Sequence, residues 1–537
     1  MDVKREERKR RTAFWISFFL PGFGQLYRGR VGSGLFFILV IYPSIYFFTK
    51  VYKGISPAII SLIIGYFTLW FLNILDAIKG PVYQKPPCRR SCPADIDVAG
   101  YIELISEGKF DDALYLISKK APFPGVLGYL CPAPCEKVCS RRRYDTPIHI
   151  KHLKRAAFTY GNLKFNPPAK ERKKKIAIIG GGPAGLSAAH YLRQEGFKVV
   201  VYERENEPGG MMRYGVPDYR LPKEITQKEI QRLIDEGVKF RAGAEFGKDF
   251  DLESLSKEYD AVIFAIGEYS SRRLGVEGED LPGVYTSLEF LFQVNRGENI
   301  SVGQEVIVIG GGDVAIDSAR VSLRLGAKNV KIISLEKTDL TSPERLPADD
   351  KEITEAKEEG IEFHGELGIK KITMKEGKFK VFTRKCVAVF DESGRFSPKF
   401  DDSVETPTFS GDTVIVAIGQ GAEKELLKDL RGNNIYVIHG APLVVEAIAR
   451  GREIAKRITK SFDGPLRSFI KWLFEFEIQV KPRRLDRHPE KFSPVKIDQE
   501  KPEKRIKSFI VVDKEYSQEE ARLEASRCLQ CPFRYKV

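Results

Sequence analysis

Three closely spaced glycines, Gly180, Gly182 and Gly185, precede the acidic residue Glu203 at a spacing that can hold a dinucleotide. In this pattern the first glycine makes a tight turn, the second lets the backbone approach a pyrophosphate, and the third lets a helix pack against a strand. The carboxylate can accept hydrogen bonds from ribose hydroxyls. The pattern therefore predicts nucleotide binding.

The elements around these glycines strengthen the prediction. Residues 176–179 form an apolar run typical of a buried strand, residues 184–194 have helical periodicity, and residues 198–202 predict a second strand. A helix that begins at a glycine turn directs free N–H groups and its dipole toward a phosphate. We also expect Pro183 and Ala184, at the start of the helix, and Arg204, after the second strand, to contact the nucleotide.

The sequence repeats this unit between Glu305 and Ser334, with Gly310, Gly312 and Ala315 at the three positions. The residues that open its helix, and are expected to face the nucleotide, are Asp313 and Val314. The second strand of the repeat is followed by Glu336 and Lys337. A carboxylate repels a 2′-phosphate and accepts from a 2′-hydroxyl, so we predict NADH rather than NADPH. Lys337 could soften this preference, and a solvated strand end is the alternative interpretation.

Seven of the eight cysteines fall in three tight groups, whereas Cys386 stands alone. Without a cleavable secretory signal, such grouping favours metal or cluster ligation over disulfides. Zinc prefers paired knuckles, and cysteine followed by proline is more typical of ferredoxin-type clusters, although a zinc-structured adaptor stays open as an alternative. The grouped cysteines, all predicted metal ligands, are Cys88, Cys92, Cys131, Cys135, Cys139, Cys528 and Cys531.

A cysteine region, a first glycine unit and a second nucleotide unit follow one another along the chain. This order resembles the small (β) subunit of bacterial glutamate synthase, the related half of dihydropyrimidine dehydrogenase and the NADH-dependent ferredoxin:NADP oxidoreductases. The resemblance implies FAD on the first unit, a nicotinamide nucleotide on the second and one or two 4Fe–4S clusters. The stretch before the tail cysteines, EEARLEASRCLQC, resembles what precedes Cys88 in these relatives, so we infer a circularly permuted cluster domain.

By this resemblance one cluster takes Cys528, Cys531, Cys88 and Cys139. The other takes Cys92, Cys131 and Cys135 with a fourth ligand that is not cysteine. Relatives carry Gln or Glu at the position of Lys154, and an ammonium group is a poor ligand. His149, His152 or solvent could substitute. A tail cysteine pair that serves a partner, or binds nothing, is the alternative interpretation.

The same resemblance implies further cofactor contacts. A flavin loop would include Gly210, Met211 and Arg213, and Gly267 would end the next strand. The turn beside the nicotinamide would contain Ala417 and Gly419. Relatives follow the second strand of the repeat with a pair of arginines, where this chain has Leu335 and Glu336, and they carry a flavin-binding aspartate near the place of His439 and Gly440.

The first eighty residues predict a membrane hairpin. Residues 31–49 and 55–75 are uncharged runs of 19 and 21 residues, near the length that a bilayer span requires. Lys and Arg are dense in residues 1–11 and few in the connector 50–54, which places both termini and the catalytic domains in the cytoplasm at the cell membrane. A buried hairpin of a soluble protein is the alternative. The net charge of +14 is spread out, so we expect no nucleic-acid partner.

We therefore expect an α/β chain with two Rossmann-like dinucleotide-binding domains, one inserted in the other, an α-helical iron–sulfur domain and a transmembrane helical hairpin. The expected function is electron movement between NAD(P)H and a partner subunit or membrane carrier through FAD and 4Fe–4S clusters. A non-catalytic electron-transfer scaffold is the alternative. The expected domains are 1–82 (anchor), 83–172 with 516–537 (iron–sulfur), 173–285 with 421–465 (FAD), 286–420 (NAD(P)) and 466–515 (linker).

Overall fold

The structure, a computed structural model, describes residues 85–163, 170–421, 434–464 and 493–531, with residues 168, 430, 432 and 467, the stretch 65–73 and scattered positions between 12 and 43. Most of the two predicted membrane spans, 31–49 and 55–75, lies outside these residues. Within the part that is described, none of the helices combines the length and the apolar character that a bilayer crossing needs.

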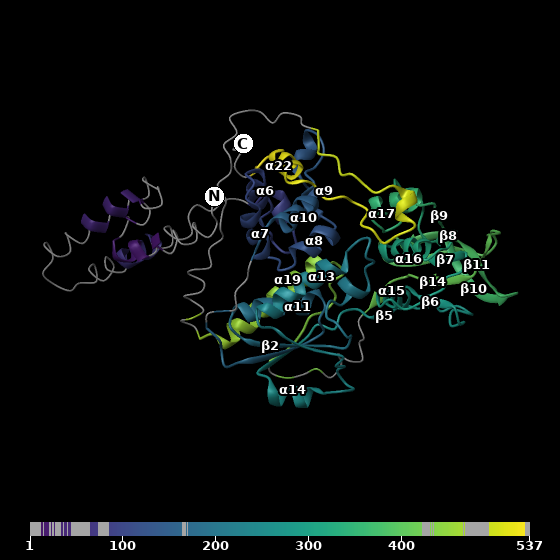
Figure 1. Ribbon diagram of the computed structural model, residues 1–537, viewed down its shortest axis with the longest axis horizontal. Coiled ribbons are helices and arrows are strands. Elements are labelled where there is room, and N and C mark those ends of the chain that lie inside the picture. The colour runs from purple at the N-terminus through teal and green to yellow at the C-terminus, as the bar shows by residue number, and fades with distance from the viewer. Residues whose placement is uncertain are drawn as a thin grey trace.

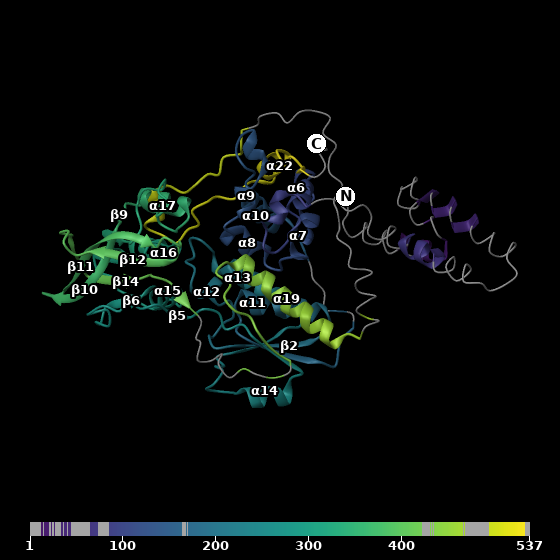
Figure 2. The same cartoon turned by 180° about the vertical axis from the view of Figure 1, so that it is seen from behind.

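Figures 1 and 2 show three bodies: a helical domain, a sheet domain below it and a second sheet domain at one side. We call them the cysteine domain (85–163 with 517–531), the first nucleotide domain (170–271 with 434–464) and the second nucleotide domain (284–418). The expectation of an α/β dinucleotide-binding fold is confirmed.

The first nucleotide domain is built on a five-stranded parallel sheet of order β16-β4-β1-β2-β3. The central strands are apolar on both faces because helices cover both sides. The long helix α19 packs along α11, and a Cβ on Gly451 would lie 2.2 Å from the carbonyl oxygen of Ala184, so only glycine permits this approach. The elements are β1 Lys175–Ile179, α11 Pro183–Gln194, β2 Lys198–Glu203, α12 Met211–Tyr214, α13 Lys223–Asp235, β3 Lys239–Ala242, α14 Leu252–Glu258, β4 Ala261–Phe264, β16 Ile435–Val437 and α19 Val444–Phe462.

The second nucleotide domain repeats this sheet in the order β6-β14-β7-β8-β9, again all parallel. An antiparallel sheet of β10, β11, β12 and β13 packs its apolar face on this domain. The short strands β5 (Ser270–Ser271) and β15 (Gln420–Gly421) pair where the chain passes between the two domains. The other elements are β6 Val284–Thr286, α15 Ser287–Asn295, β7 Glu305–Ile309, α16 Asp313–Arg324, β8 Asn329–Ile333, α17 Asp350–Glu358, β9 Glu362–His364, β10 Leu367–Lys375, β11 Lys378–Phe390, β12 Phe396–Asp401, β13 Thr408–Gly411 and β14 Thr413–Val416.

Short helices make up the cysteine domain, and the C-terminal helix α22 completes it. Helix α22 (Gln518–Ser526) contacts α6 (Val98–Ser106) and α10 (Ile150–Tyr160), so the tail returns to the part of the chain that contains Cys88. A capping box between Ser517 and Glu520 fixes the start of α22. The remaining elements are α5 Pro87–Arg90, α7 Phe110–Ser118, α8 Pro124–Leu130, α9 Pro134–Lys137 and the 3₁₀ turn η1 Ser140–Arg143.

Residues 493–516, which we call the strap, cross from the cysteine domain to the second nucleotide domain and back (Figure 1). The segment was expected to be part of a motif-free linker, yet its described part is packed. Where the strap meets the second nucleotide domain it forms the short helix α21 (Pro502–Arg505). Arg505 is buried there and pairs at 2.9 Å with Glu358, the last residue of α17. On the return, Asp513 accepts from His152 at 3.1 Å and pairs with Lys351. The strap therefore joins two domains.

Candidate functional site

The glycine turn between β1 and α11 has the geometry of a phosphate cradle. Gly180 has a φ of +103°, and a Cβ there would lie 2.4 Å from the carbonyl oxygen of Ala265, so the turn requires glycine. A Cβ on Gly182 would meet nothing within 4 Å, which leaves room for a pyrophosphate at the start of the helix. The Glu203 carboxylate accepts from the Gly181 N–H at 2.7 Å. Burial raises the pKa of Glu203, although hydrogen bonds from the Glu205 and Gly181 N–H groups oppose the rise.

The second glycine turn repeats this arrangement of one glycine with positive φ and one glycine with open space beside it. Gly310 has a φ of +138°, and its Cβ would lie 2.2 Å from the carbonyl oxygen of Ala417, while a Cβ on Gly312 would again meet nothing within 4 Å. Oε2 of Glu336 lies 2.7 Å from the ideal Cβ position of Gly311, as Oε2 of Glu203 lies 2.9 Å from that of Gly181. The carboxylate of Glu336 therefore lies beside the second cradle as the carboxylate of Glu203 lies beside the first.

A cavity of about 320 Å³ runs from the first cradle toward the second nucleotide domain. Its lining includes predicted residues of the first glycine turn, the helix start that follows the second turn, and residues that no motif had indicated. The predicted residues Gly310, Gly312, Glu336, Ala417 and Gly419 are not part of this lining. From the first nucleotide domain come Gly180, Gly182, Pro183, Ala184, Glu203, Arg204, Gly210, Met211, Gly267, Tyr269 and Arg220, from the second Asp313, Val314 and Asp317, and from the cysteine domain Leu130.

The structure separates some of the predicted residues from this cavity. Arg213 pairs with Glu207 and donates to Gln227 at 3.1 Å. Gly185 and Ala315 lie buried in the first turns of α11 and α16, and a Cβ on Gly185 would lie 2.0 Å from the carbonyl oxygen of Gly180. At the place of the absent aspartate, His439 and Gly440 do line the cavity. Arg204 lies 4.2 Å above the ring of Tyr269, a cation–π contact that holds both side chains at the cavity wall.

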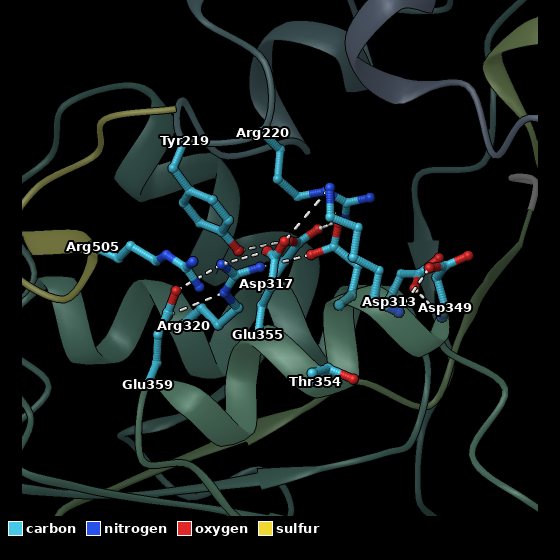
Figure 3. A network of polar contacts seen from close by, with 12 residues as sticks. Tyr219, Arg220, Asp313, Asp317, Arg320, Asp349, Thr354, Glu355, Glu359 and Arg505 are labelled. Carbon is cyan, nitrogen blue, oxygen red and sulfur yellow. Dashed lines mark hydrogen bonds and ion pairs between the residues drawn. The ribbon is translucent and has the colours of Figure 1, made fainter. Parts of the chain in front are cut away.

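A buried polar network fixes the second nucleotide domain against a loop of the first (Figure 3). Tyr219 and Arg220 reach across to Asp317 on α16, at 2.8 and 2.6 Å. Behind them Arg320, which is fully buried, pairs with carboxylates of α17. These carboxylates belong to Glu352, Glu355 and Glu359. Asp313 accepts from the Asp349 N–H at 2.9 Å, so its side chain is oriented before any nucleotide binds.

Four of the grouped cysteines line one small cavity of about 20 Å³ in the cysteine domain. They are Cys88, Cys139, Cys528 and Cys531, the set inferred from the permutation. Burial raises the pKa of Cys88, and the charges of neighbouring thiols, Cys528 first, raise it further. Gln530 donates to the Ala99 carbonyl at 3.0 Å and so anchors the loop between the two tail cysteines. The donor set fits a thiolate-held cluster.

The other three grouped cysteines gather around one lysine. Lys154 on α10 is almost fully buried, with 3% of its surface exposed. Burial alone would lower the pKa of Lys154, but the charges of Cys131, Cys135 and Cys92 together raise it. His149 and His152 instead hydrogen-bond to strap residues, at 2.7 and 3.1 Å. In the described chain no three Cys, His, Asp or Glu side chains converge tightly enough for a single ion, whereas a cluster spreads its ligands over several irons.

Two contacts between domains were not indicated by any sequence pattern. Leu130 ends α8 and lines the large cavity, and the next residue, Cys131, belongs to the three-cysteine set. At the other end of α8, the Glu229 carboxylate on α13 accepts from the N–H groups of Gly125 and Val126 at 2.8 and 3.1 Å. Burial raises the pKa of Glu229 to about 7. An acidic residue at a helix start is recognisable in sequence only when it is local, and this one comes from another domain.

Two parallel sheets with paired glycine cradles, joined to a cysteine-rich helical domain, define a dinucleotide-dependent flavoprotein oxidoreductase with iron–sulfur sites. Two family models match accordingly: pyridine nucleotide-disulphide oxidoreductase over residues 174–440, and dihydropyrimidine dehydrogenase domain II, 4Fe-4S cluster, over residues 81–164. The expectation of an NAD(P)H-dependent FAD oxidoreductase is confirmed at this level, as are FAD and 4Fe–4S as its cofactors.

The chain belongs to the family of the glutamate synthase small chains and their oxidoreductase relatives. It is 30% identical over 420 residues to the NADPH glutamate synthase small chain of Azospirillum brasilense. The aligned region covers 70% of this chain and 86% of that relative. It is 32% identical to the NADP(+)-dependent formate dehydrogenase subunit beta of Moorella thermoacetica, over 84% of this chain and 71% of that one.

A further relative is the NADPH-Fe(3+) oxidoreductase subunit beta of Geobacter sulfurreducens, 37% identical over 68% of this chain. The matched part spans 56% of the length of that relative. The family is thus shown, while the substrates and partners of these relatives remain properties of those proteins.

Proposed function

We propose that this chain is an electron-transfer subunit that oxidises a nicotinamide nucleotide and passes the electrons through FAD and two iron–sulfur sites to a partner protein or carrier. One observation carries the proposal: α8 ends with Leu130 in the wall of the nucleotide cavity, and Cys131 follows in the three-cysteine set. Members of both cysteine sets pack against one apolar core that includes Tyr101. The three-cysteine set therefore begins one residue beyond the cavity wall.

The cofactors supply the redox chemistry, hydride acceptance by FAD and one-electron transfer by the clusters. The chain contributes binding and orientation. The N–H groups of the two cradles bind pyrophosphates, and Glu203 accepts from ribose hydroxyls. Asp313 and Val314 face the cavity from the second domain and would direct the nicotinamide toward the flavin. Cys88, Cys139, Cys528 and Cys531 would hold one cluster, and Cys92, Cys131 and Cys135 the other.

We propose NADH as the preferred donor, although all three relatives described above carry NADPH or NADP(+) in their names. Glu336 lies at its cradle as Glu203 lies at the first. It is oriented by its own strand end, where Ser334 donates to the Glu336 carbonyl at 3.1 Å. A 2′-phosphate would meet this partly buried carboxylate, and like charges at such a site cost several kcal/mol.

Partner and location are also proposals. Two relatives are named as β subunits, which supports a companion subunit that provides the electron acceptor or donor. The uncharged runs at 31–49 and 55–75 support attachment to the bilayer with the described domains on the cytoplasmic side. Separation of membranes from a cell extract, followed by alkaline washing, tests this. Recovery of the intact chain in the washed supernatant contradicts an integral anchor.

Anaerobic purification of the full chain tests the activity. Iron, acid-labile sulfide and FAD are quantified, and the flavin absorbance is followed in a stopped-flow instrument after mixing with NADH or NADPH. We expect bound FAD, iron for two sites, and bleaching that is faster with NADH at equal concentration. A flavin spectrum that neither nucleotide bleaches supports the non-catalytic scaffold, and faster bleaching by NADPH contradicts the donor assignment alone.

A further inference from the structure

One carboxylate in the wall of the nucleotide cavity has no partner in the part of the chain that the structure describes. Five carboxylates line this cavity. Four are engaged in hydrogen bonds or ion pairs, those of Glu203, Asp313, Asp317 and Glu245. The fifth belongs to Glu268, which is only partly exposed and makes neither contact with a described residue. An ionised carboxylate only accepts hydrogen bonds, so Glu268 is suited to a ligand that donates them.

Glu268 lies beside the first cradle, on the side opposite Glu203. In the sheet order β16-β4-β1-β2-β3, the cradle follows β1, Glu203 ends β2, and Glu268 lies in the loop after β4. This loop touches the cradle, because a Cβ on Gly180 would lie 2.4 Å from the carbonyl oxygen of Ala265. A dinucleotide bound by its pyrophosphate extends to both sides of the cradle. With the adenosine ribose at Glu203, the flavin half and its ribityl chain would extend toward Glu268.

The neighbouring loop, after β16, leaves room for this carboxylate and offers none of its own. Gly440 in this loop has a φ of +28°, and a Cβ there would lie 3.3 Å from Oε1 of Glu268. A side chain at this position would therefore crowd the carboxylate. Across both loops, residues 265–269 and 438–443, Glu268 is the only acidic residue. An acceptor carboxylate at this edge of the sheet thus comes from the loop after β4.

The backbone that presents Glu268 is held against the cradle by the next residue, Tyr269. Arg204 lies 4.2 Å above the ring of Tyr269, and the ring of Phe292 meets it edge-on with 5.5 Å between the centroids. On the cradle side, a Cβ on Gly210 would lie 3.5 Å from the Tyr269 hydroxyl. Because Tyr269 is enclosed on these sides, the protein sets the place of Glu268 in the cavity wall before a cofactor binds.

We propose that Glu268 binds the flavin half of FAD, by accepting hydrogen bonds from hydroxyl groups of the ribityl chain. A hydrogen bond to an ionised acceptor is about twice as strong as one between neutral groups. The two acidic residues then divide the cofactor between them, since Glu203 accepts from the adenosine ribose and Glu268 from the ribityl chain. Glu268 is a cofactor-binding residue and transfers neither hydride nor proton. The inference rests on the part of the proposed function that assigns FAD to the first nucleotide domain.

The test measures the FAD affinity of the full-length protein after reversible anaerobic removal of its flavin, with binding followed by quenching of flavin fluorescence. The variants are E268A, which removes the carboxylate, and E268Q, which keeps one acceptor oxygen without the charge. E289Q is the control, because Glu289 is exposed beside Leu288 of the cavity wall and does not itself line the cavity. We expect E268A to raise the Kd for FAD about tenfold or more, and E268Q to raise it less. E289Q should match the wild type.

FAD analogues that each lack one ribityl hydroxyl distinguish a direct contact from a general loss of structure. In the wild type, at least one of these analogues should bind about tenfold more weakly than FAD. In E268A that difference should disappear, because the hydroxyl and the carboxylate form one interacting pair. If E268A yields no folded protein, the same comparison is made with E268Q, in which the difference should shrink.

The inference is overturned if E268A and E268Q bind FAD as the wild type does, or if every deleted hydroxyl costs the variants as much affinity as it costs the wild type. If E268A instead raises KM for NADH at saturating FAD and leaves FAD affinity unchanged, the carboxylate serves the nicotinamide nucleotide and the inference is likewise wrong. A wild-type protein that binds no FAD refutes the cofactor assignment itself, and this result is read before any variant is compared.

Discussion

Glu229 makes the attachment of the cysteine domain to the first nucleotide domain sensitive to pH. Its carboxylate accepts from two N–H groups at the start of α8, and it is 1% exposed. Burial is the largest influence and raises the pKa from 4.5 to about 7, against the opposing charge of Arg232 and the two backbone hydrogen bonds. The folded protein therefore binds more protons at Glu229 than the unfolded chain does between these two pH values.

The sign follows from linkage: where the folded state binds more protons, stability falls as pH rises. A shift from 4.5 to about 7 corresponds to roughly 3 kcal/mol, lost as pH rises through the folded pKa. Of this, roughly 2 kcal/mol falls between pH 5.5 and pH 8, a window in which iron–sulfur proteins can be handled. The free energy that holds the start of α8 should decrease by this amount.

The assay is native-state hydrogen exchange of the holoprotein, read by mass spectrometry on peptides that contain residues 123–131. Exchange is corrected for the intrinsic pH dependence, and the wild type is compared with E229Q, which cannot ionise. A multidomain protein with cofactors does not unfold in two states, so a local free energy is the appropriate quantity. The protection of the wild type relative to E229Q should fall about thirtyfold from pH 5.5 to pH 8.

The control is E224Q, since Glu224 lies on the same helix with an exposed side chain. Its protection relative to the wild type should not depend on pH. A pH-independent ratio between the wild type and E229Q would refute the reasoning, because it would mean that Glu229 keeps an ordinary pKa. A ratio that rises with pH would show that the two N–H groups outweigh burial.

Three further predictions concern the other sites. E336R should raise the ratio of kcat/KM for NADPH to that for NADH by about a hundredfold or more. The reason is that repulsion between the Glu336 carboxylate and a 2′-phosphate, which costs several kcal/mol, is replaced by attraction; an unchanged ratio would mean that the 2′-group binds elsewhere. C528S should remove about half of the iron in an anaerobic preparation, whereas C386S should remove none; equal iron contents would exclude the tail from the cluster. R320M should lower the thermal midpoint of the second nucleotide domain, because it leaves two buried carboxylates and one partly buried carboxylate with one cation fewer, at a cost of about 3–5 kcal/mol in the free energy of unfolding; a scanning calorimeter detects this, and an unshifted midpoint would contradict the role of the network.

Local patterns were sufficient to predict the two nucleotide domains. The glycines at 180, 182 and 310, 312 require positive φ or open space at fixed places in a strand–turn–helix unit, so the residue types reveal the geometry directly. The tail was inferred differently: the resemblance of EEARLEASRCLQC to the stretch before Cys88 in relatives, rather than a local pattern, indicated the missing part of the cysteine domain, and the structure brings Cys528 and Cys531 to Cys88.

Contacts between distant residues were not predictable from one sequence. Arg213 was expected at the flavin, but its direction depends on Glu207 and Gln227, which compete for the guanidinium. The strap carries no motif, because its affinity for the second nucleotide domain comes from single pairs such as Arg505 with Glu358. Such pairs have the composition of any solvated surface, so neither partner indicates the other until the fold places them together.

Helix α8 joins the cysteine domain to the first nucleotide domain, whereas the second nucleotide domain is attached mainly through other elements. Glu229 fixes the start of this helix, and its end enters the cavity wall at Leu130 and continues into Cys131. This short helix, held at its start by Glu229 of the first nucleotide domain and ending in the cavity wall, therefore sets the spacing between cavity and cysteines. The second nucleotide domain is joined through β5 and β15, the buried polar network and the strap, and the strap also contacts α8, where Tyr129 donates to Glu515 at 3.2 Å. Of these three connections, the strap is therefore the one through which an adjustment of that domain on nucleotide binding would reach the helix that spaces cavity and cysteines.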